Sequence, residues 1–329
     1  MTRGKLLGLL AALGAAAGIA WWLLREPPGP ATAPRPSPPL QPPASAGEAI
    51  SRLRREVEAL RQGGKSRVDY RAPTGDELND YRSWVDGRLR SVMGRAAGEL
   101  AAPAGFRLLD LGSIGQLLAE EQHQQRGAGV VALRAGPTQP WVIEVPHSFF
   151  DEGTLEVGLN AFVLTNARAL LVNTVHRYRS RASAPADGTD TSDDDDDDVS
   201  SDVAHAESSF FLTAHTTLVD SLGDVGVVQL HGYGDGSAPK ADLVLSAAGS
   251  RADPVPAAKA LERALGLRVA VYPKQIRKLG GTKNVQARYS ISVGRPFLHV
   301  EMSRSLRKEL TAEPERLRAF IGALFSGEL

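Results

Sequence analysis

The chain has 329 residues, enough for one large domain with accessory segments or for two smaller domains. It carries 38 basic and 38 acidic residues, so the formal net charge is zero and no positive excess favours nucleic acid as a partner. Cysteine is absent, which excludes disulfides, thiol catalysis, cysteine-based zinc sites and a lipoprotein anchor.

Residues 1–25 form an apolar segment that predicts a membrane anchor. Arg3 and Lys5 precede a run without charge that continues to Arg25, roughly the twenty residues that a membrane-spanning helix requires. The positive-inside rule places the basic end in the cytoplasm. We therefore expect a single-pass inner-membrane protein whose C-terminal domain lies in the periplasm. The alternative is a signal peptide cleaved near residues 15–17, which would give a secreted form.

Two accessory segments follow the predicted anchor. Residues 26–47 are rich in proline and predict an extended, semi-rigid linker. Within residues 48–66, the apolar positions Ile50, Leu53, Val57 and Leu60 recur at helical spacing. We expect a short amphipathic helix there, which packs on the following domain or on a helix of a partner.

Residues 67–329 alternate helical patterns with short apolar runs. The predicted strands are 129–135, 141–145, 169–173, 225–230, 241–247, 268–272 and 297–303. The predicted helices are 76–102, 113–125, 154–167, 208–222, 254–266 and 313–325. Strands rich in Val, Leu and Ile that alternate with helices are typical of a sheet covered on both faces. The expected fold is therefore α/β, with a single mostly parallel or mixed sheet covered by helices.

The segment 182–201 interrupts this alternation with six consecutive aspartates at 193–198. Like charges repel one another, so we expect a disordered, solvated insertion in the domain. A loop that attracts calcium is the alternative, although the segment lacks the ligand spacing of an EF-hand. An insertion at the carboxyl end of a strand in an open parallel sheet would border the ligand site.

Three of the seven histidines, His147, His176 and His231, directly follow predicted strands. The carboxyl ends of parallel strands lie at one edge of a sheet, so we expect these histidines to converge there. Zinc in hydrolases takes three ligands from His, Asp and Glu and keeps one position for water. His147 with Asp151 or Glu152 can supply two ligands from one loop, and His231 the third. The two acids can instead cap the helix that follows them.

Glu301 lies within the apolar strand 297–303, where a carboxylate is costly to bury without a purpose. Beside a metal-activated water it can act as general base and return the proton to a leaving amine. A salt bridge to Arg304 or Arg307 is the alternative. Arg304 can also clamp a substrate carboxylate. Further candidates for orienting an acidic substrate are Asn173, His176, Arg177, Lys283, Asn284, Gln286 and Arg288.

Five short stretches resemble landmarks of the N-formylglutamate amidohydrolases and their relatives in the zinc carboxypeptidase clan. They are VPHSFFDEGT from residue 145, VNTVHRY from 172, DVAHAESSFF from 202, VVQLHGYG from 227 and VEMSRSLR from 300. The resemblance spans about residues 129–307. It implies Zn2+ held by His147, Glu152 and His231, with Glu301 as the catalytic base.

The first landmark departs from the clan's pattern in its spacing. The clan spaces its first two ligands as His-x-x-Glu, whereas here the acids stand four and five residues after His147. Glu152 precedes Gly153, as is usual in the clan, so the resemblance favours Glu152 over Asp151 as the ligand.

The substrate side of the site is also implied by the resemblance, with Arg304 or Arg177 gripping a substrate carboxylate. The stretch NTVHR stands where the family has an asparagine–arginine pair, so recognition of the substrate departs from the family more than the metal site does. His205 either relays a proton in the same pocket or is a simple loop residue.

The expected function is that of a membrane-anchored, extracytoplasmic zinc-dependent hydrolase. Its substrate would be small and acidic or a peptide: an N-acyl amino acid, a poly-glutamate chain or a cell-wall peptide cleaved at an amide next to a carboxylate. One alternative is a non-catalytic envelope binding or scaffold protein that retains the fold. Another is a stalked interaction module in which the helix within 48–66 matters most.

Overall fold

The computed structural model describes residues 46–64, 70–97, 101–121, 128–178, 180 and 200–327. All of them belong to the unit Pro39–Leu329. The predicted anchor at 1–25 lies outside these residues, as do nearly all of the predicted linker and of the acidic insertion. Among the residues that are described, no helix is both long enough and apolar enough to cross a membrane.

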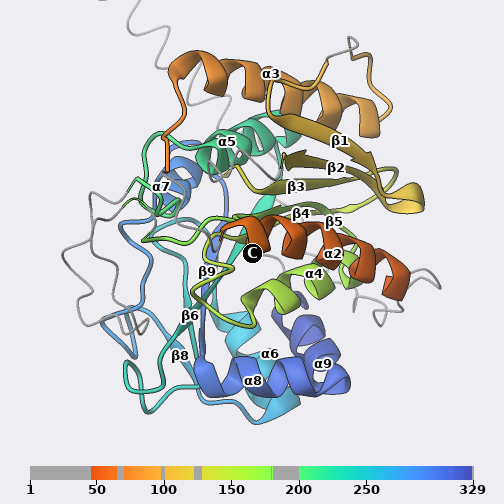
Figure 1. Cartoon of the computed structure of the whole chain (residues 1–329). Helices are drawn as coiled ribbons and strands as arrows, with labels where there is room; N and C mark the ends of the chain where they lie inside the picture. Colours follow the sequence, from red (N-terminus) through yellow and green to blue (C-terminus); the bar gives the residue numbers. More distant parts are fainter. Residues whose placement is uncertain are drawn as a thin grey trace, which may run out of the picture. The chain divides into compact units, whose positions relative to one another are not determined.

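A nine-stranded sheet forms the centre of this unit, in the order β1-β2-β3-β5-β4-β6-β9-β7-β8 (Figure 1). Its strands are β1 (Phe106–Asp110), β2 (Gly115–Glu120), β3 (Val130–Arg134), β4 (Gln139–Val145), β5 (Ala167–Val172), β6 (Gly226–Tyr233), β7 (Leu243–Ser246), β8 (Val269–Val271) and β9 (Phe297–Ser303). The central strands β5, β4, β6 and β9 run parallel to one another. Antiparallel pairs flank them on both sides, so the mixed form of the predicted sheet is confirmed.

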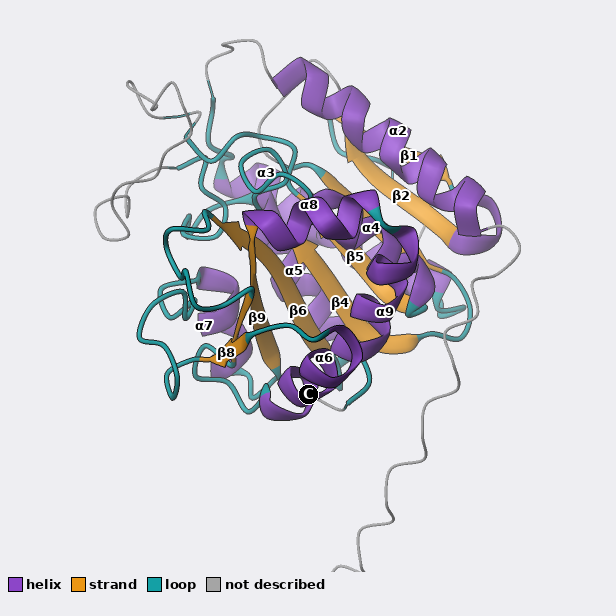
Figure 2. Ribbon diagram, turned by 90° about the horizontal axis from the view of Figure 1, so that it is seen from below, coloured by secondary structure: helices purple, strands orange, loops and turns teal. Residues whose placement is uncertain are grey.

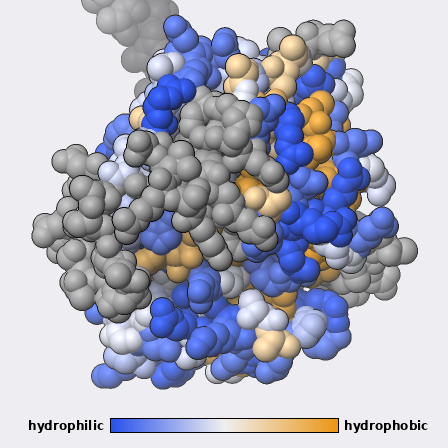
Figure 3. Space-filling view, in the orientation of Figure 1, coloured by the Kyte–Doolittle hydropathy of each residue, from blue (hydrophilic) through white to orange (hydrophobic). Residues whose placement is uncertain are grey.

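Helices cover both faces of the sheet (Figure 2). One face carries α2 (Ala46–Gly64), α4 (Thr154–Leu164), α6 (Val255–Leu265), α8 (Arg304–Ala312) and α9 (Pro314–Leu324). The other carries α3 (Gly75–Val92), α5 (Phe210–Leu222) and α7 (Val285–Ser292). Each layer buries its apolar side chains against the sheet, and full burial of one Leu or Phe stabilises the fold by about 1.5–3 kcal/mol. On the face seen in Figure 3, hydrophilic residues predominate among those that are coloured, and hydrophobic residues are visible between them.

The predicted amphipathic helix is α2, which packs on α4. Leu53 and Val57 are fully buried in the same core as the strands. Arg54 donates hydrogen bonds to the Glu156 carboxylate at 2.6 and 2.7 Å. Of the two packing partners considered for this helix, the α/β unit itself is therefore the one observed.

The predicted helix at 113–125 is wrong, because residues 115–120 form strand β2 instead. A 3-10 turn, Gly112–Ile114, joins β1 to β2, and Gly112 and Gly115 have φ angles of 66° and 141°. A Cβ at Gly115 would lie 2.0 Å from the Leu133 carbonyl oxygen, so this residue must be glycine for β2 to approach β3. Pairing with strands on both sides overrides the helical spacing of the leucines.

Four further elements differ from the sequence-based expectation. The predicted helix 76–102 ends as α3 at Val92, where Gly94 takes a left-handed conformation with φ of 66°. Helix α7 occupies a stretch that was expected to be a loop, and Asn284 caps it by accepting the Ala287 N–H. Strand β1 and helix α8 were not anticipated as elements.

Candidate metal centre

Three buried side chains converge where two central strands end: His147 after β4, Asp151 just beyond it and His231 on β6. Their ligand atoms all lie within 4.8 Å of one another. An Asp151 carboxylate oxygen is 3.5 Å from Nδ1 of His147 and 3.8 Å from Nδ1 of His231. The predicted convergence at the carboxyl edge is therefore observed for His147 and His231.

A single helical turn after β4 determines which of the two acids, Asp151 or Glu152, lies beside His147. The Asp151 N–H donates to the His147 carbonyl at 2.8 Å, so the two residues stand one turn apart. Side chains at i and i+4 lie on the same face of such a turn, whereas i+5 lies about 100° further round. Glu152 is accordingly exposed, and the preference for Glu152 in the cluster is corrected to Asp151.

The group's geometry suits a divalent metal ion. Ligands about 2 Å from a tetrahedral zinc lie roughly 3.3 Å from one another, close to the observed separations between Asp151 and the two imidazoles. Two imidazole nitrogens and one carboxylate oxygen form a typical ligand set for catalytic zinc, which leaves one position for water. The residues present therefore fit the ion that the sequence resemblance implies.

The ring nitrogen of His147 that points away from the candidate metal site contacts Asp202. The sequence alone did not predict this residue. Nε2 of His147 lies 2.8 Å from Asp202 Oδ1, so this nitrogen is the donor and Nδ1 faces the cluster. Arg177 and His205 also bind the Asp202 carboxylate, at 2.7 and 3.2 Å. Metal-bound histidines commonly donate their second N–H to a carboxylate, which orients the ring.

The two histidines of the cluster have opposite proton affinities. Burial lowers the pKa of His147, but the charge of Asp202 and the bonds to Asp202 and Asp151 outweigh it and raise the pKa to about 9. Burial, together with the neighbouring His299, His147 and Arg177, holds the pKa of His231 well below its ordinary value. These shifts favour a protonated His147 and a neutral His231 at pH 7 when no metal is bound, and a metal ion would displace the proton on His147.

Glu301 stands on β9 directly across from His231 in the register of two parallel strands. Its side chain is buried, and its Oε1 lies 3.2 Å from Nε2 of His299. Oε2 of Glu301 and Nδ1 of His299 have no hydrogen-bond partner among the described residues. A buried carboxylate oxygen without a partner beside a candidate metal site is placed to accept a proton from water.

Arg307 is not in a salt bridge with Glu301, the alternative that the sequence offers, but binds three backbone carbonyls. Nε donates to the Glu152 carbonyl at 2.6 Å, and Nη1 donates to those of Tyr233 (3.3 Å) and Met302. These carbonyls belong to the three segments that carry Asp151, His231 and Glu301. The buried guanidinium therefore holds the framework of the site together and is not placed to receive a substrate.

The predicted substrate-binding residues divide into two groups. Arg177 and His205 contact Asp202, the partner of His147. His176 contacts the loop between His147 and Asp151, where its ring lies 5.7 Å from that of Phe150.

The remaining candidates do not face the cluster. Arg304 is exposed at the start of α8, and Arg288 is exposed and pairs with Glu207. Asn173 is fully buried and hydrogen-bonds to the backbone of Pro146 and Val175. Lys283 is exposed. Asn284 and Gln286 contact the interior of the domain, beneath the cluster.

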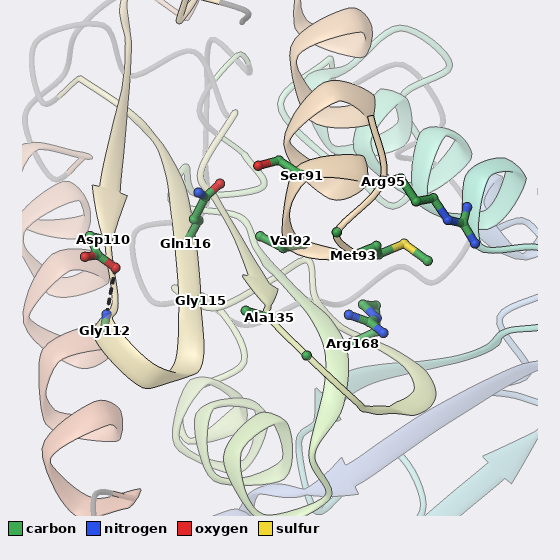
Figure 4. Close-up of a pocket in the computed structure, with 12 residues that line it drawn as sticks. Ser91, Val92, Met93, Arg95, Asp110, Gly112, Gly115, Gln116, Ala135 and Arg168 are labelled. Atoms are coloured by element: carbon green, nitrogen blue, oxygen red, sulfur yellow. Dashed lines mark hydrogen bonds between the residues drawn. The ribbon is translucent and has the colours of Figure 1, made fainter. Parts of the chain in front are cut away.

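A cavity of about 620 Å3 lies apart from the cluster (Figure 4). It is lined by the end of α3, the turn between β1 and β2, and Arg168 at the start of β5. The cluster lies at the carboxyl ends of the parallel strands, so this cavity is at the opposite end of the sheet. Burial, and then the charge of Arg95, lower the pKa of Arg168. Arg95 and Arg168 line this cavity together with a single acidic residue, Asp110, so it lacks the set of ligands that a metal cation requires.

No family model matches the chain, and neither does any curated protein sequence. Among solved structures, the N-formylglutamate amidohydrolase from Ralstonia eutropha JMP134 is 17% identical with a TM-score of 0.35, over 60% of this chain and 97% of that one. Zinc-free apo YndL is 16% identical with a TM-score of 0.38, over 59% and 86%. The Atu2144 gene product of Agrobacterium tumefaciens is 12% identical with a TM-score of 0.37, over 56% and 86%. The likeness is distant and assigns no role to any residue of this chain.

Proposed function

We propose that this protein is a zinc-dependent hydrolase that cleaves an amide bond next to a carboxylate. The observation that carries the proposal is the buried His147–Asp151–His231 group, with the carboxylate of Glu301 on the adjacent strand. The group offers the ligand set of a catalytic zinc site, and Glu301 supplies a base whose Oε2 has no hydrogen-bond partner among the described residues. The five landmark stretches that resemble the N-formylglutamate amidohydrolases agree with this chemistry.

In the proposed reaction, His147, Asp151 and His231 hold the ion. When bound, zinc supplies Lewis-acid polarisation of the carbonyl and lowers the pKa of water. Glu301 accepts the proton of the attacking water and delivers it to the departing amine nitrogen. Asp202 keeps His147 oriented during these steps through its hydrogen bond to Nε2.

Arg177 is the better of the two arginines proposed to recognise the substrate carboxylate. Its charge acts on both His147 and His231, whereas Arg304 is exposed on α8. The Arg177 guanidinium also lies 5.5 Å from the centre of the Phe150 ring. An acidic substrate bound here would have its carboxylate near Arg177 and its amide near the metal. The substrate class that follows is an N-acyl amino acid, a poly-glutamate chain or a cell-wall peptide.

We also propose that the apolar segment within residues 1–25 anchors the chain in the inner membrane with its folded unit in the periplasm. Its support is the uncharged run after Arg3 and Lys5. Fractionation of cells and protease treatment of spheroplasts test this. A full-length chain in the membrane fraction that protease removes is expected, and a chain in the cytosolic fraction would contradict it.

Metal analysis of the full-length protein tests the ligand set directly. We expect about one zinc per chain, which is lost in His231→Ala. His176→Ala is the matched control, because His176 lies beside the cluster but outside it, and this variant should keep its zinc. A wild-type protein that neither copurifies with zinc nor binds it on addition would refute the proposed function.

Turnover separates an enzyme from a binding protein with the same fold. Glu301→Gln should keep its zinc and lose hydrolysis of N-acyl amino acids or γ-glutamyl peptides by about 100-fold or more, because general-base catalysis contributes on that order. Unchanged turnover would remove Glu301 from the reaction. Ligand binding without turnover in the zinc-loaded wild-type protein would instead identify a non-catalytic binding protein.

A further inference from the structure

A row of buried polar side chains crosses the sheet beneath the His147–Asp151–His231 group. Glu144 on β4, Gln229 on β6, His299 on β9 and Ser246 on β7 are neighbours in register, and each is at most 4% exposed. Burying polar groups is unfavourable unless their hydrogen bonds are made. Gln229 lies at the centre of this row and contacts His231, so its hydrogen bonds bear on the metal site.

The orientation of the Gln229 amide is fixed on one side by two acceptors. Oε2 of Glu144 lies 2.8 Å from Nε2 of Gln229, and an ionised carboxylate can only accept. Oε1 of Gln286 lies 3.3 Å from the same nitrogen. The Gln286 amide is itself oriented, because its Nε2 donates to the Val203 carbonyl at 2.8 Å. The atom of Gln229 that faces these groups must therefore be its NH2.

A donor fixes the other side of the same amide. Oδ1 of Asn284 accepts the Ala287 N–H at 2.9 Å as the cap of α7, so Nδ2 is the atom turned toward Gln229. Nδ2 of Asn284 lies 2.6 Å from Oε1 of Gln229. Three anchors, Glu144 on β4, Gln286 on α7 and the cap residue Asn284, thus agree on one orientation, in which Oε1 points to the metal site.

The orientation of Gln229 determines the proton position on His231. Nε2 of His231 lies 2.7 Å from Oε1 of Gln229, an acceptor, so Nε2 carries the hydrogen. In the neutral ring, Nδ1 then holds the lone pair, and Nδ1 is the atom that faces Asp151 at 3.8 Å. A metal ion can bind only the nitrogen that carries no hydrogen.

We propose that Gln229 is a positioning residue that holds His231 as its Nε2–H tautomer and so presents Nδ1 to the metal ion. The proposal rests on the metal site of the proposed function. Glu144 is held in turn by His215 on α5, at 2.7 Å, and Ser290 on α7 lies 3.3 Å from the other ring nitrogen of His215. Two helices on one face of the sheet therefore secure the tautomer of a ligand on β6.

Nitrogen NMR of the metal-free, full-length protein labelled with 15N at histidine tests the tautomer without any zinc. The shifts of Nδ1 and Nε2 identify which nitrogen carries hydrogen, and the signal missing in His231→Asn assigns the ring. We expect a neutral Nε2–H ring at pH 7.5. A neutral Nδ1–H ring, or an equal mixture of the two tautomers, would overturn the proposal.

Asn284→Asp replaces the donor that faces Oε1 of Gln229 with an acceptor. It keeps the cap of α7, since Asp and Asn cap equally well. The new carboxylate can only accept, so it draws the Gln229 NH2 toward itself and toward His231. We expect loss of the pure Nε2–H signal and a zinc Kd raised about tenfold or more, as for other groups that orient metal ligands.

The matched control is Asn284→Ser, which keeps a cap but places no acceptor against Gln229. It should keep the Nε2–H signal and a Kd within about threefold of wild type. Equal effects in the two variants, or an Asn284→Asp protein with the wild-type spectrum and affinity, would contradict the inference.

Different results would refute the proposed zinc-dependent function and the orienting role of Gln229. If the wild-type protein binds no zinc but shows the Nε2–H tautomer, the proposed function fails and the orienting role of Gln229 stands. If zinc binds to a ring that is Nδ1–H in the metal-free protein, the metal site stands and the role of Gln229 fails.

Discussion

Asp151 and Glu152 are adjacent in the chain, yet one side chain is buried against two imidazoles and the other is exposed. The helical turn that starts at His147 causes this difference. A carboxylate in the cluster contributes both charge and a ligand atom, whereas Glu152 contributes its backbone carbonyl to Arg307. Asp151 thus contributes its side chain to the site, and Glu152 contributes its backbone.

We expect Asp151→Asn to weaken zinc binding by about 100-fold or more, beyond the range seen for residues that only orient ligands. Glu152→Gln should leave zinc affinity unchanged, because its side chain lies outside the cluster. Competition with a chromogenic chelator measures both. If Glu152→Gln lost zinc and Asp151→Asn kept it, the positions of the two acids in the structure would be wrong.

At this scale, the sequence predicted that His147 and His231 lie together, because residues at the ends of parallel strands converge by topology alone. Glu301 was chosen for a different reason, as a carboxylate within an apolar strand. It could not choose between Asp151 and Glu152, since that choice depends on whether the chain turns helically after β4. Asp202 was missed because its contact with His147 is tertiary, and no local spacing reveals it. Gln229 lies only two residues before His231, but the three residues that orient its amide, Glu144, Gln286 and Asn284, are distant in the sequence. The only signal for Asp202 was its place in DVAH, three residues before a histidine.

Helix α8 contributes more than apolar packing, because its Arg307 hydrogen-bonds to the backbone of three segments of the site. The guanidinium lies over Gly232, where a Cβ would be only 1.9 Å from Nη1. Gly232 is therefore required by the arginine rather than by its own backbone angles.

Arg307→Lys should reduce the free energy of unfolding by about 2 kcal/mol or more, since a lysine cannot reach all three carbonyls and leaves buried acceptors without donors. Gly232→Ala should also destabilise the fold, because its methyl group displaces the same guanidinium. Arg304→Lys is the control on the exposed side of α8 and should be neutral. Urea unfolding curves compare the three variants, and a neutral Arg307→Lys would contradict this role.

Asp242 binds Arg268, the residue directly before the edge strand β8. Its carboxylate accepts the backbone N–H of Arg268 at 2.8 Å and also binds the guanidinium. The side-chain hydrogen bond from Arg268 is the main cause that lowers the pKa of Asp242 below its ordinary value. Because the folded-state pKa is the lower one, the ionised carboxylate stabilises the fold above about pH 4, and this stabilisation is lost as pH falls through the folded pKa.

Asp242→Asn should therefore cost about 1 kcal/mol in the free energy of unfolding at pH 7, the scale of a partly exposed, charge-assisted hydrogen bond. The difference from wild type should shrink as pH drops below 4. Unfolding curves at a series of pH values measure it, and a difference independent of pH would exclude the carboxylate as its source.

At the level of elements, the sequence was most reliable where the helical or strand pattern was long and unbroken. It failed at 113–125, where the apolar residues suited either element and two glycines with positive φ decided for a hairpin. It also missed α7, whose buried polar side chains Gln286 and Ser290 contact Gln229 and His215 and so give no amphipathic pattern. Because polar residues of α7 are buried, its sequence lacks the apolar periodicity from which a helix is predicted.

For the molecule as a whole, the proposed zinc ion should act as a stabilising ligand. Zinc at about 1,000 times its Kd would stabilise the folded chain by about 4 kcal/mol. We expect the midpoint of thermal unfolding to rise by several degrees on zinc addition and to fall on treatment with a chelator. His231→Ala should show neither change. A midpoint that does not respond to zinc in the wild-type protein would contradict a specific site.

The ligands also differ in when they can meet during folding. His147 and Asp151 share one turn and come together locally, whereas His231 joins them only after β6 has paired with β4 and a long stretch of chain has been closed. An ion held by all three ligands thus recognises a late arrangement of the chain. Zinc should therefore lengthen the lifetime of the native state by slowing unfolding, while the rate of refolding changes little.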